Sequence, residues 1–287
     1  MAPQSNQNTT AFTVATLGIA TFAAMDAIMK DLGLAIGAYN ALLWRTMLAC
    51  MLAGLFFLWQ GFHLPQKPVL RLHLWRGAIT SVMAFLFFWG LKYVPLAEAI
   101  ALSFIAPLIA MYLARVLLAE PIGAMAIVAS VIGFSGALVI VAGKLGGDYG
   151  DNMLQGTIAI LLSAVLYAYN LILQRQQAIV AQPLEIAFFQ NCTVFGIYLL
   201  FAPFLAVFPP STEYAGLLGA AVLGLASLML LAWAYARAEA RVLIPVEYTA
   251  FIWASLLGWV FFGEIVTVQT LMGTGLIVTG CIMAARQ

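Results

Sequence analysis

The sequence predicts an all-α integral membrane protein with ten transmembrane helices, arranged as two inverted repeats of five helices each. Three observations predict this fold. The first is composition: 64% of the 287 residues are hydrophobic and only 8% are charged, whereas soluble domains carry about 25% charged residues. The second is a series of apolar stretches of about 20 residues, the length that crosses a bilayer. The third is a similarity between the two halves of the chain.

The same composition excludes several classes of protein. A soluble domain of this size has too little interior to bury so many apolar residues, so soluble enzymes and disordered proteins are excluded. The net charge of +1 provides no basic patch for nucleic acid. The chain is therefore expected to have the lipid bilayer as a partner, and no nucleic acid.

Each apolar stretch is bounded by short polar, Gly or Pro segments and is interpreted as one membrane span. The first ten residues contain no Lys or Arg, so the first stretch is predicted to be a span and not a cleaved signal peptide. The predicted spans are 11–30, 38–59, 75–93, 97–118, 122–142, 155–174, 184–207, 214–236, 243–262 and 266–285.

The two halves share residues at a nearly constant separation. Glu120 and Glu264 each end an apolar stretch and are 144 residues apart, and Asp26 and Asn170 have the same separation. We therefore predict one repeat in residues 1–145 and a second in residues 146–287. Because each repeat has an odd number of spans, the second is inverted relative to the first. Such repeats are typical of secondary transporters, whose substrate site lies between the halves.

The distribution of Lys and Arg predicts the orientation, because cytoplasmic loops carry the excess of these residues. Eight lie on the side of the N-terminus and three on the opposite side, with Arg45 inside a span. Both termini are therefore predicted to be cytoplasmic, and the short loops suit a bacterial inner membrane. The eight are Lys67, Arg71, Arg76, Arg115, Arg175, Arg237, Arg241 and Arg286; the three are Lys30, Lys92 and Lys144.

Five segments carry a family resemblance: MDAIMKDLG (25–33), WRT (44–46), KYVPLAEAIALSFIAPL (92–108), LLAEP (117–121) and AYARAEARVLIPVEYTAFIWASLLGWVFFGE (234–264). Together they resemble the drug/metabolite transporter superfamily, of the EamA-domain type, over nearly the whole chain. One departure is Ala119-Glu120, where Gly-Glu is commoner in the family. The resemblance implies a secondary carrier of a small organic metabolite, such as an amino acid, S-adenosylmethionine or riboflavin, that works by alternating access through a central cavity.

Ionisable residues inside spans are candidate substrate contacts, because each costs about 2.5–3.5 kcal/mol in the bilayer. Arg45 lies about 10 Å into the second span and is expected to bind an anionic group of the substrate through its forked guanidinium. The alternatives are an ion pair with Asp26 or Glu98, or snorkelling to the outer interface. Asp26 is expected to bind substrate or a coupling proton, and its alternative is a pair with Lys30, four residues on.

Several further candidate site residues also have a structural interpretation. Glu98 and Glu247 each begin a span, where a carboxylate also stabilises a helix N-terminus, and Glu120 and Glu264 are predicted to be helix-start and turn residues. Pro107 and Pro245 are candidate hinges, because proline permits a kink. Aromatic and amide side chains that stack or hydrogen-bond complete the predicted substrate site: Trp44, Tyr93, Asn170, Gln190, Tyr248 and Trp253.

No cofactor or metal is predicted. The three cysteines, Cys50, Cys192 and Cys281, lie in apolar stretches without CxxC spacing, so they are expected to be unpaired packing residues. An integral-membrane enzyme of lipid metabolism is the alternative function. It would need clustered His, Asp or Cys. The two histidines, His63 and His73, share one predicted cytoplasmic loop, but neither has an Asp five residues on, as an acyltransferase-like motif would need. An ion channel is disfavoured because no stretch resembles a selectivity filter.

Overall fold

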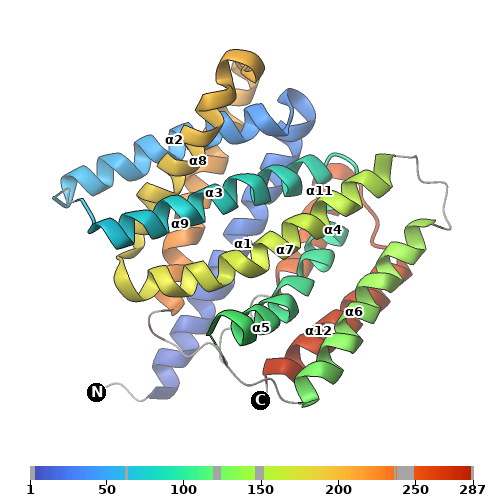
Figure 1. The fold of residues 1–287 in the computed structure, drawn as a ribbon. Helices are drawn as coiled ribbons and strands as arrows, with labels where there is room; N and C mark the ends of the chain where they lie inside the picture. Colours follow the sequence, from blue (N-terminus) through green and yellow to red (C-terminus); the bar gives the residue numbers. More distant parts are fainter. Residues whose placement is uncertain are drawn as a thin grey trace.

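The computed structural model describes residues 4–61, 64–118, 124–145, 152–235, 237 and 249–285. Within these ranges the regular structure is helical (Figure 1). In chain order the elements are α1 (Gln4–Ile36), α2 (Ala38–Trp59), α3 (Lys67–Gly90), α4 (Leu96–Ser103), α5 (Ile105–Leu118), α6 (Ala124–Leu145), α7 (Asn152–Val180), α8 (Pro183–Leu205), the 3-10 turn η1 (Ser211–Glu213), α9 (Tyr214–Tyr235), α11 (Thr249–Phe262) and α12 (Val268–Ala285).

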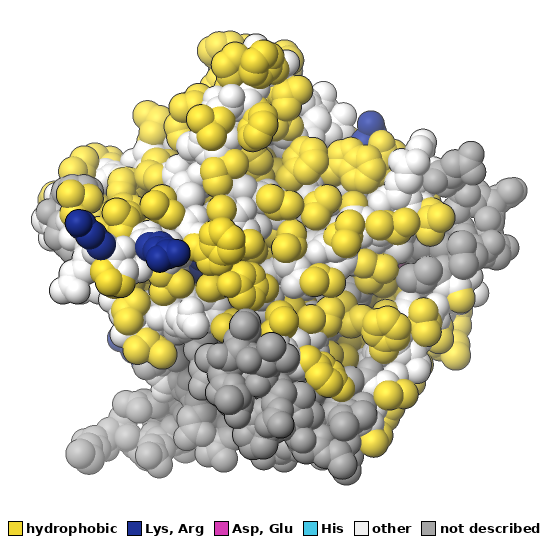
Figure 2. All heavy atoms as spheres, viewed as in Figure 1, with side chains coloured by type: hydrophobic (Ala, Val, Ile, Leu, Met, Phe, Trp, Pro, Cys, Tyr) yellow, Lys and Arg dark blue, Asp and Glu magenta, His cyan; other side chains and the backbone are white. Residues whose placement is uncertain are grey.

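Helix length and surface character both identify a multi-pass membrane protein. Among the described residues, α1, α2, α3, α7, α8 and α9 are long and apolar enough to cross a bilayer, and α4–α5, α6, α11 and α12 contain shorter apolar helices. Large apolar side chains are exposed on the outside, for example Trp59 and Phe204. Figure 2 shows a face that is largely hydrophobic, with few Lys or Arg. Lipid stabilises such a surface, whereas water does not.

Several helix boundaries differ from the sequence prediction: α1 and α7 extend beyond the predicted 11–30 and 155–174, and two further differences concern the third and fourth spans. The third span was expected to begin at residue 75, but α3 begins at Lys67, where Pro68 occupies one of the first helical positions and favours a helix start. The fourth span was expected to be one helix, but it is broken at Phe104 into α4 and α5. The break precedes Pro107, which has no N–H to donate to the preceding turn.

Helices from the first and second parts of the chain pack against each other in pairs. The pairs are α1 with α9, α3 with α7, α2 with α8 and α6 with α12. Small residues allow two of these pairs to approach closely: a Cβ atom added at Gly273 would lie 2.5 Å from the carbonyl oxygen of Gly136, and one at Gly90 would lie 2.8 Å from that of Gly156. Glycine at both sides of a contact is the usual way for membrane helices to pack backbone against backbone.

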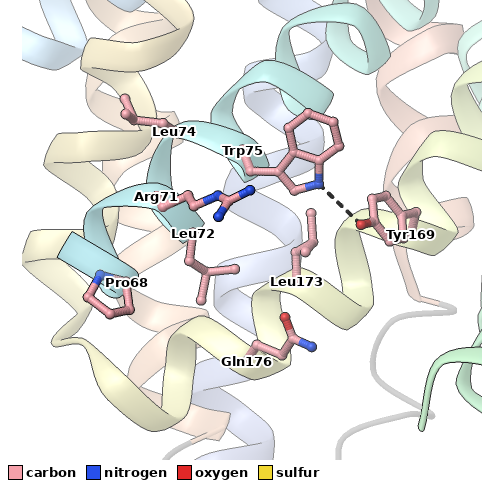
Figure 3. Close-up of a pocket in the computed structure, with 8 residues that line it drawn as sticks. All are labelled: Pro68, Arg71, Leu72, Leu74, Trp75, Tyr169, Leu173 and Gln176. Atoms are coloured by element: carbon pink, nitrogen blue, oxygen red, sulfur yellow. Dashed lines mark hydrogen bonds between the residues drawn. The ribbon is translucent and has the colours of Figure 1, made fainter.

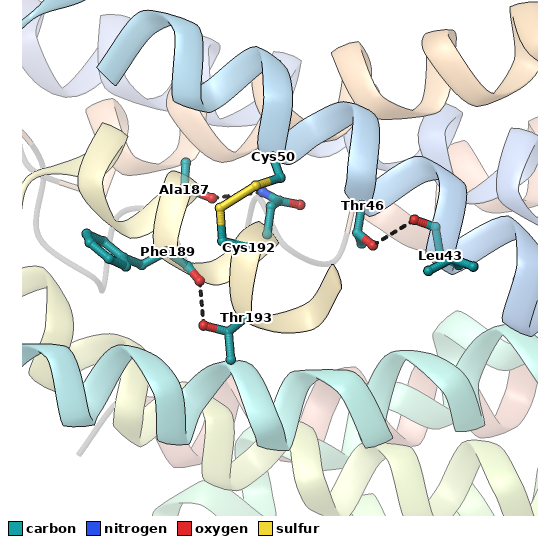
Figure 4. The surroundings of a disulfide bond; sticks show 8 residues. Leu43, Thr46, Cys50, Ala187, Phe189, Cys192 and Thr193 are labelled. Carbon is teal, nitrogen blue, oxygen red and sulfur yellow. Dashed lines mark hydrogen bonds between the residues drawn. A yellow bond between two sulfur atoms is a disulfide. The ribbon is translucent and has the colours of Figure 1, made fainter. Parts of the chain in front are cut away.

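The expectation that all three cysteines are unpaired is wrong for two of them. Cys50 on α2 and Cys192 on α8 form a disulfide, with their Cα atoms 5.2 Å apart (Figure 4). Their separation of 142 positions in the sequence gave no local sign of this pair. They meet because α2 packs on α8, which brings the two Cα atoms within the range that a disulfide spans.

A thiol count tests this pairing. In protein unfolded in detergent without reductant, a maleimide reagent should label one of the three cysteines, and after reduction it should label all three, because a disulfide sulfur does not react. Cys50→Ser should expose Cys192 and raise the count without reductant to two. Three labelled thiols in the unreduced wild type would show that the disulfide does not form.

Candidate functional site

An ion pair joins the first helix to a residue in the last part of the sequence. Lys30, near the end of α1, pairs through its Nζ with Oε1 of Glu264 and also donates to the carbonyl oxygen of Val94 at 3.0 Å. The second carboxylate oxygen of Glu264 accepts the backbone N–H of Leu96, the first residue of α4, at 2.8 Å. The side chains of Lys30 and Glu264 are only 6% and 17% exposed. The pair therefore links α1 and the start of α4 to the segment between α11 and α12.

Glu98 completes this group, which we call the Lys30 cluster: Lys30, Glu98, Glu264 and Thr270. Oγ1 of Thr270 on α12 donates to Oε1 of Glu98 on α4 at 3.1 Å, and Glu98 lies within electrostatic range of Lys30. The structure thereby decides against two of the alternatives left open by the sequence. Lys30 pairs with Glu264 and not with Asp26, although Asp26 lies one turn earlier on the same helix, and the cation near Glu98 is Lys30 and not Arg45.

Glu264 has a larger role than the predicted one of a turn residue. It does follow a turn at Gly263, whose φ of +64° suits glycine. Its carboxylate, however, caps a helix far away in the sequence and balances the charge of Lys30. A residue at the end of an apolar stretch gives no local sign of such a distant partner.

Asp26 and Arg45 are brought near each other by the packing of α1 on α2. Asp26 on α1 is 1% exposed, and Arg45 on α2 lies within electrostatic range of it. Nη1 of Arg45 is 3.6 Å from Sδ of Met25, and a Cβ atom added at Gly224 on α9 would lie 3.2 Å from the same nitrogen. The guanidinium of Arg45 therefore extends from α2 into the space between α1 and α9.

The polar atoms of this pair are not fully used within the protein. In the part of the chain that the structure describes, neither carboxylate oxygen of Asp26 has a hydrogen-bond partner, and Nε of Arg45 has none either. Burying a polar group without a partner is costly, and native proteins rarely leave one unexplained. Asp26 and Arg45 thus offer a carboxylate and a guanidinium to a further group, which makes them the candidate ligand site.

A second buried polar group was missed by the sequence analysis, which placed His73 in a loop and Arg76 at the cytoplasmic start of a span. Both lie in α3, because this helix begins earlier than expected. Arg76 is 5% exposed, and its Nε donates to Oδ1 of Asn170 at 2.9 Å while Nη1 donates to Oε1 of Gln177 at 2.5 Å. The sequence signal was the spacing of Asn170, Gln174 and Gln177, which puts three amides on one face of a helix.

The hydrogen bonds fix the protonation of His73. Because Oε1 of Gln177 accepts from Arg76, its Nε2 is the donor to Nδ1 of His73, at 2.8 Å. Nδ1 is then unprotonated, so Nε2 carries the proton and donates to Oε1 of Glu185 at 3.0 Å. The cation of Arg76 and the anion of Glu185 are thus linked through an amide and a neutral imidazole. We call these residues and Asn170 the Arg76 cluster.

The predicted amides belong to this cluster and not to the Arg45 site. Nε2 of Gln190 on α8 donates to Oγ1 of Thr80 at 2.7 Å, and Thr80 donates to Oδ1 of Asn170 at 3.3 Å. Asn170 and Gln190 therefore meet through Thr80. Oε1 of Gln190 has no hydrogen-bond partner among the described residues. It is therefore a further buried acceptor that a bound group could satisfy.

The predicted aromatic residues are dispersed. Nε1 of Trp44 donates to the carbonyl oxygen of Val207 at 2.9 Å, and its ring packs against Phe208 with centroids 4.9 Å apart. Tyr93 packs against Trp89, with centroids 5.1 Å apart. Trp253 lines a groove of about 420 Å³ with residues of α1, and its Nε1 has no partner in the described ranges. These three side chains do not form one cage.

Of the remaining predicted residues, one lies in α5 and the others lie outside the described residues. Pro107 is the third residue of α5, directly after the break at Phe104. Glu247, Tyr248, Pro245 and Glu120 lie outside the described residues.

Comparison with known proteins then decides the family. The model of the EamA-like transporter family matches residues 9–142 and, a second time, residues 154–286. The chain belongs to the EamA-like transporter family. Its general function is therefore transport across a membrane, and its relatives carry the names of transporters and not of enzymes.

This EamA-like transporter is 26% identical over 277 residues to the pseudopaline exporter CntI of Pseudomonas aeruginosa (strain UCBPP-PA14), with 95% of each chain covered. It is 26% identical over 222 residues to a riboflavin transporter of Rhizobium johnstonii, covering 75% of this chain and 70% of the relative. A crystal structure with 20% identity matches at a TM-score of 0.63 over 96% of each chain. That structure shows the same fold.

Proposed function

We propose that this EamA-like transporter is a secondary carrier of a small organic metabolite, with ten spans in two inverted repeats, residues 1–145 and 146–287. Two observations support the repeats. The family model matches the chain twice, and the helix contacts are mirrored: α1 packs on α9 as α7 packs on α3, while α2 packs on α8 and α6 on α12. Such repeats alternate access by moving one half against the other.

The substrate class follows from Asp26 and Arg45, whose unpartnered buried atoms are the observation that carries the proposal. A buried carboxylate binds a cationic group, and a guanidinium binds a carboxylate or phosphate. The two lie within electrostatic range of each other. One ligand that satisfies both is a small zwitterion with an amine close to a carboxylate. Substrate that fills the site then removes the cost of leaving these groups unpaired.

The Lys30 cluster supplies a gate in this scheme. Its bonds join α1 and α4 to Glu264 and α12, so the end that they close is expected to open only when Glu264 leaves Lys30 and Leu96. By the predicted orientation this end faces the cell exterior. We expect α5 to move against α4 at the break beside Pro107. A ligand drives such a change only through its different affinity for the two states.

The experiment compares a zwitterion with its charge-blocked analogues. Purified protein is tested by thermal unfolding against a panel of amino acids, and each hit is retested as its methyl ester and as its N-acetyl derivative. A ligand at about 100 times its Kd stabilises by about 2.7 kcal/mol. We expect the parent compound to stabilise the protein, to be taken up into proteoliposomes and to lose both properties when either charge is blocked. Equal binding of both analogues would contradict the proposed substrate class.

The same liposomes address the coupling ion. Asp26 is the candidate proton carrier because it is a buried carboxylate in the substrate site. If protons are coupled, an imposed pH gradient will drive accumulation of the substrate, and an ionophore that collapses the gradient will abolish it.

A further inference from the structure

A groove between α3 and α7 lies apart from the Asp26–Arg45 site. Its volume is about 590 Å³ (Figure 3). Lys67 and Pro68 begin α3 beside it, and the exposed side chains of Leu74 and Trp75 stand at its edge. Because these apolar side chains face outward in a membrane protein, the groove opens toward lipid. It is lined by Pro68, Arg71, Leu72, Leu74, Trp75, Tyr169, Leu173 and Gln176.

The polar lining consists of hydrogen-bond donors around one positive charge. Arg71 is exposed, and the eight lining residues include no Asp or Glu. Nε1 of Trp75 donates to the hydroxyl oxygen of Tyr169 at 3.1 Å. The hydroxyl hydrogen of Tyr169 is then free to donate to another group, and the amide of Gln176 adds a further donor. This set of donors suits an anion.

The apolar lining suits a hydrocarbon chain. Leu72 on α3 and Leu173 on α7 extend into the space between the two helices (Figure 3). A ligand that satisfies both parts of the groove therefore has a phosphate at the Arg71 end and an acyl chain along the leucines. Trp and Tyr at the edge are typical of the level of the lipid headgroups.

We propose that this groove binds an anionic phospholipid of the cytoplasmic leaflet, with its phosphate at Arg71 and Tyr169. The leaflet follows from the predicted orientation, which puts the start of α3 and the end of α7 on the cytoplasmic side. Anionic lipids are attracted there to basic pockets between membrane helices. The bound lipid holds α3 against α7, next to the Arg76 cluster that joins the same two helices.

The test measures lipid binding to the purified full chain. Phosphatidylglycerol and phosphatidylcholine with identical acyl chains are added at equal mole fraction, and binding is followed by native mass spectrometry and by thermal unfolding. We expect phosphatidylglycerol to bind and to raise the unfolding temperature more than phosphatidylcholine does. Arg71→Gln should weaken phosphatidylglycerol about fivefold, the loss expected for one basic group near a lipid surface. Tyr169→Phe should weaken it by a smaller factor.

Arg237→Gln is the matched control. Arg237 is also exposed and also lies beside an indole, but its guanidinium stacks on Trp233 at 4.1 Å and donates to the carbonyl oxygen of that residue. The Arg237→Gln substitution should leave the affinity for phosphatidylglycerol unchanged. Equal losses in Arg71→Gln and Arg237→Gln, or none in Arg71→Gln, would overturn the site. Glycerol phosphate, which lacks acyl chains, should give no shift at the same concentration; an equal shift would assign the groove to a soluble anion.

Discussion

Lys30→Met is expected to lower the free energy of unfolding by about 3–5 kcal/mol, the usual cost of leaving one partner of a buried ion pair alone. The loss should be large here because Lys30 is the cation next to two carboxylates, Glu264 and Glu98. Without it, two anions remain close together in a buried environment. Chemical or thermal unfolding of the purified protein measures the effect.

Removing the other partner should cost less. Glu264→Gln leaves Lys30 near Glu98 and keeps an oxygen that can accept from the N–H of Leu96. The double variant should be more stable than Lys30→Met alone, because it removes one of the two unbalanced anions. Lys92→Met is the control, since Lys92 is exposed and lies over the ring of Tyr93 at 5.4 Å. A Lys30→Met protein as stable as this control would show that the pair contributes nothing.

Arg45→Gln and Asp26→Asn are expected to reduce transport by about 30-fold or more, because losing one partner of a buried charged contact costs about 2–5 kcal/mol. Arg45→Lys keeps the charge but not the planar fork, so it should recover only part of the loss. Uptake of the identified substrate into proteoliposomes, measured as kcat/KM, checks these values.

Stability separates a substrate role of Asp26 from a structural one. Asp26→Asn removes a buried carboxylate that has no hydrogen-bond partner in the described chain, which stabilises the protein, but it also removes the anion near Arg45, which destabilises it. Because the two effects oppose each other, the stability of the empty protein should change little. Transport should nevertheless fall. Asp31→Asn, at an exposed position on the same helix, should change neither property. If Asp26→Asn unfolds more easily and transports normally, Asp26 is structural.

The sequence was sufficient for the class of fold, because a series of apolar stretches as long as a bilayer is thick is typical of membrane-spanning helices. The predicted range 38–59 is that of α2. The start of α3 was missed because Lys67, Arg71 and His73 look like loop residues, although in the structure His73 is buried beside Gln177 and Glu185. Polarity alone does not separate a loop from a helix whose polar side chains face protein.

The candidate site was predictable only in part. A charged residue in an apolar stretch is visible in any sequence, and Arg45 and Asp26 were found for that reason. Their proximity depends on how α1 packs on α2, and the partner of Lys30 lies 234 positions away. Long-range pairs of this kind leave no periodic or spacing signal, so neither the ion pair nor the Cys50–Cys192 disulfide was expected.

The disulfide between α2 and α8 restricts how the protein can move. A covalent link prevents the parts of the chain on its two sides from separating there, so rotation about the link is the main relative motion that remains. Such a rotation widens the assembly at one end while it narrows the other. Cys50 and Cys192 would thus act as a fixed pivot. This one disulfide would oppose any conformation in which both ends of the assembly are open at once and solute could leak across the membrane.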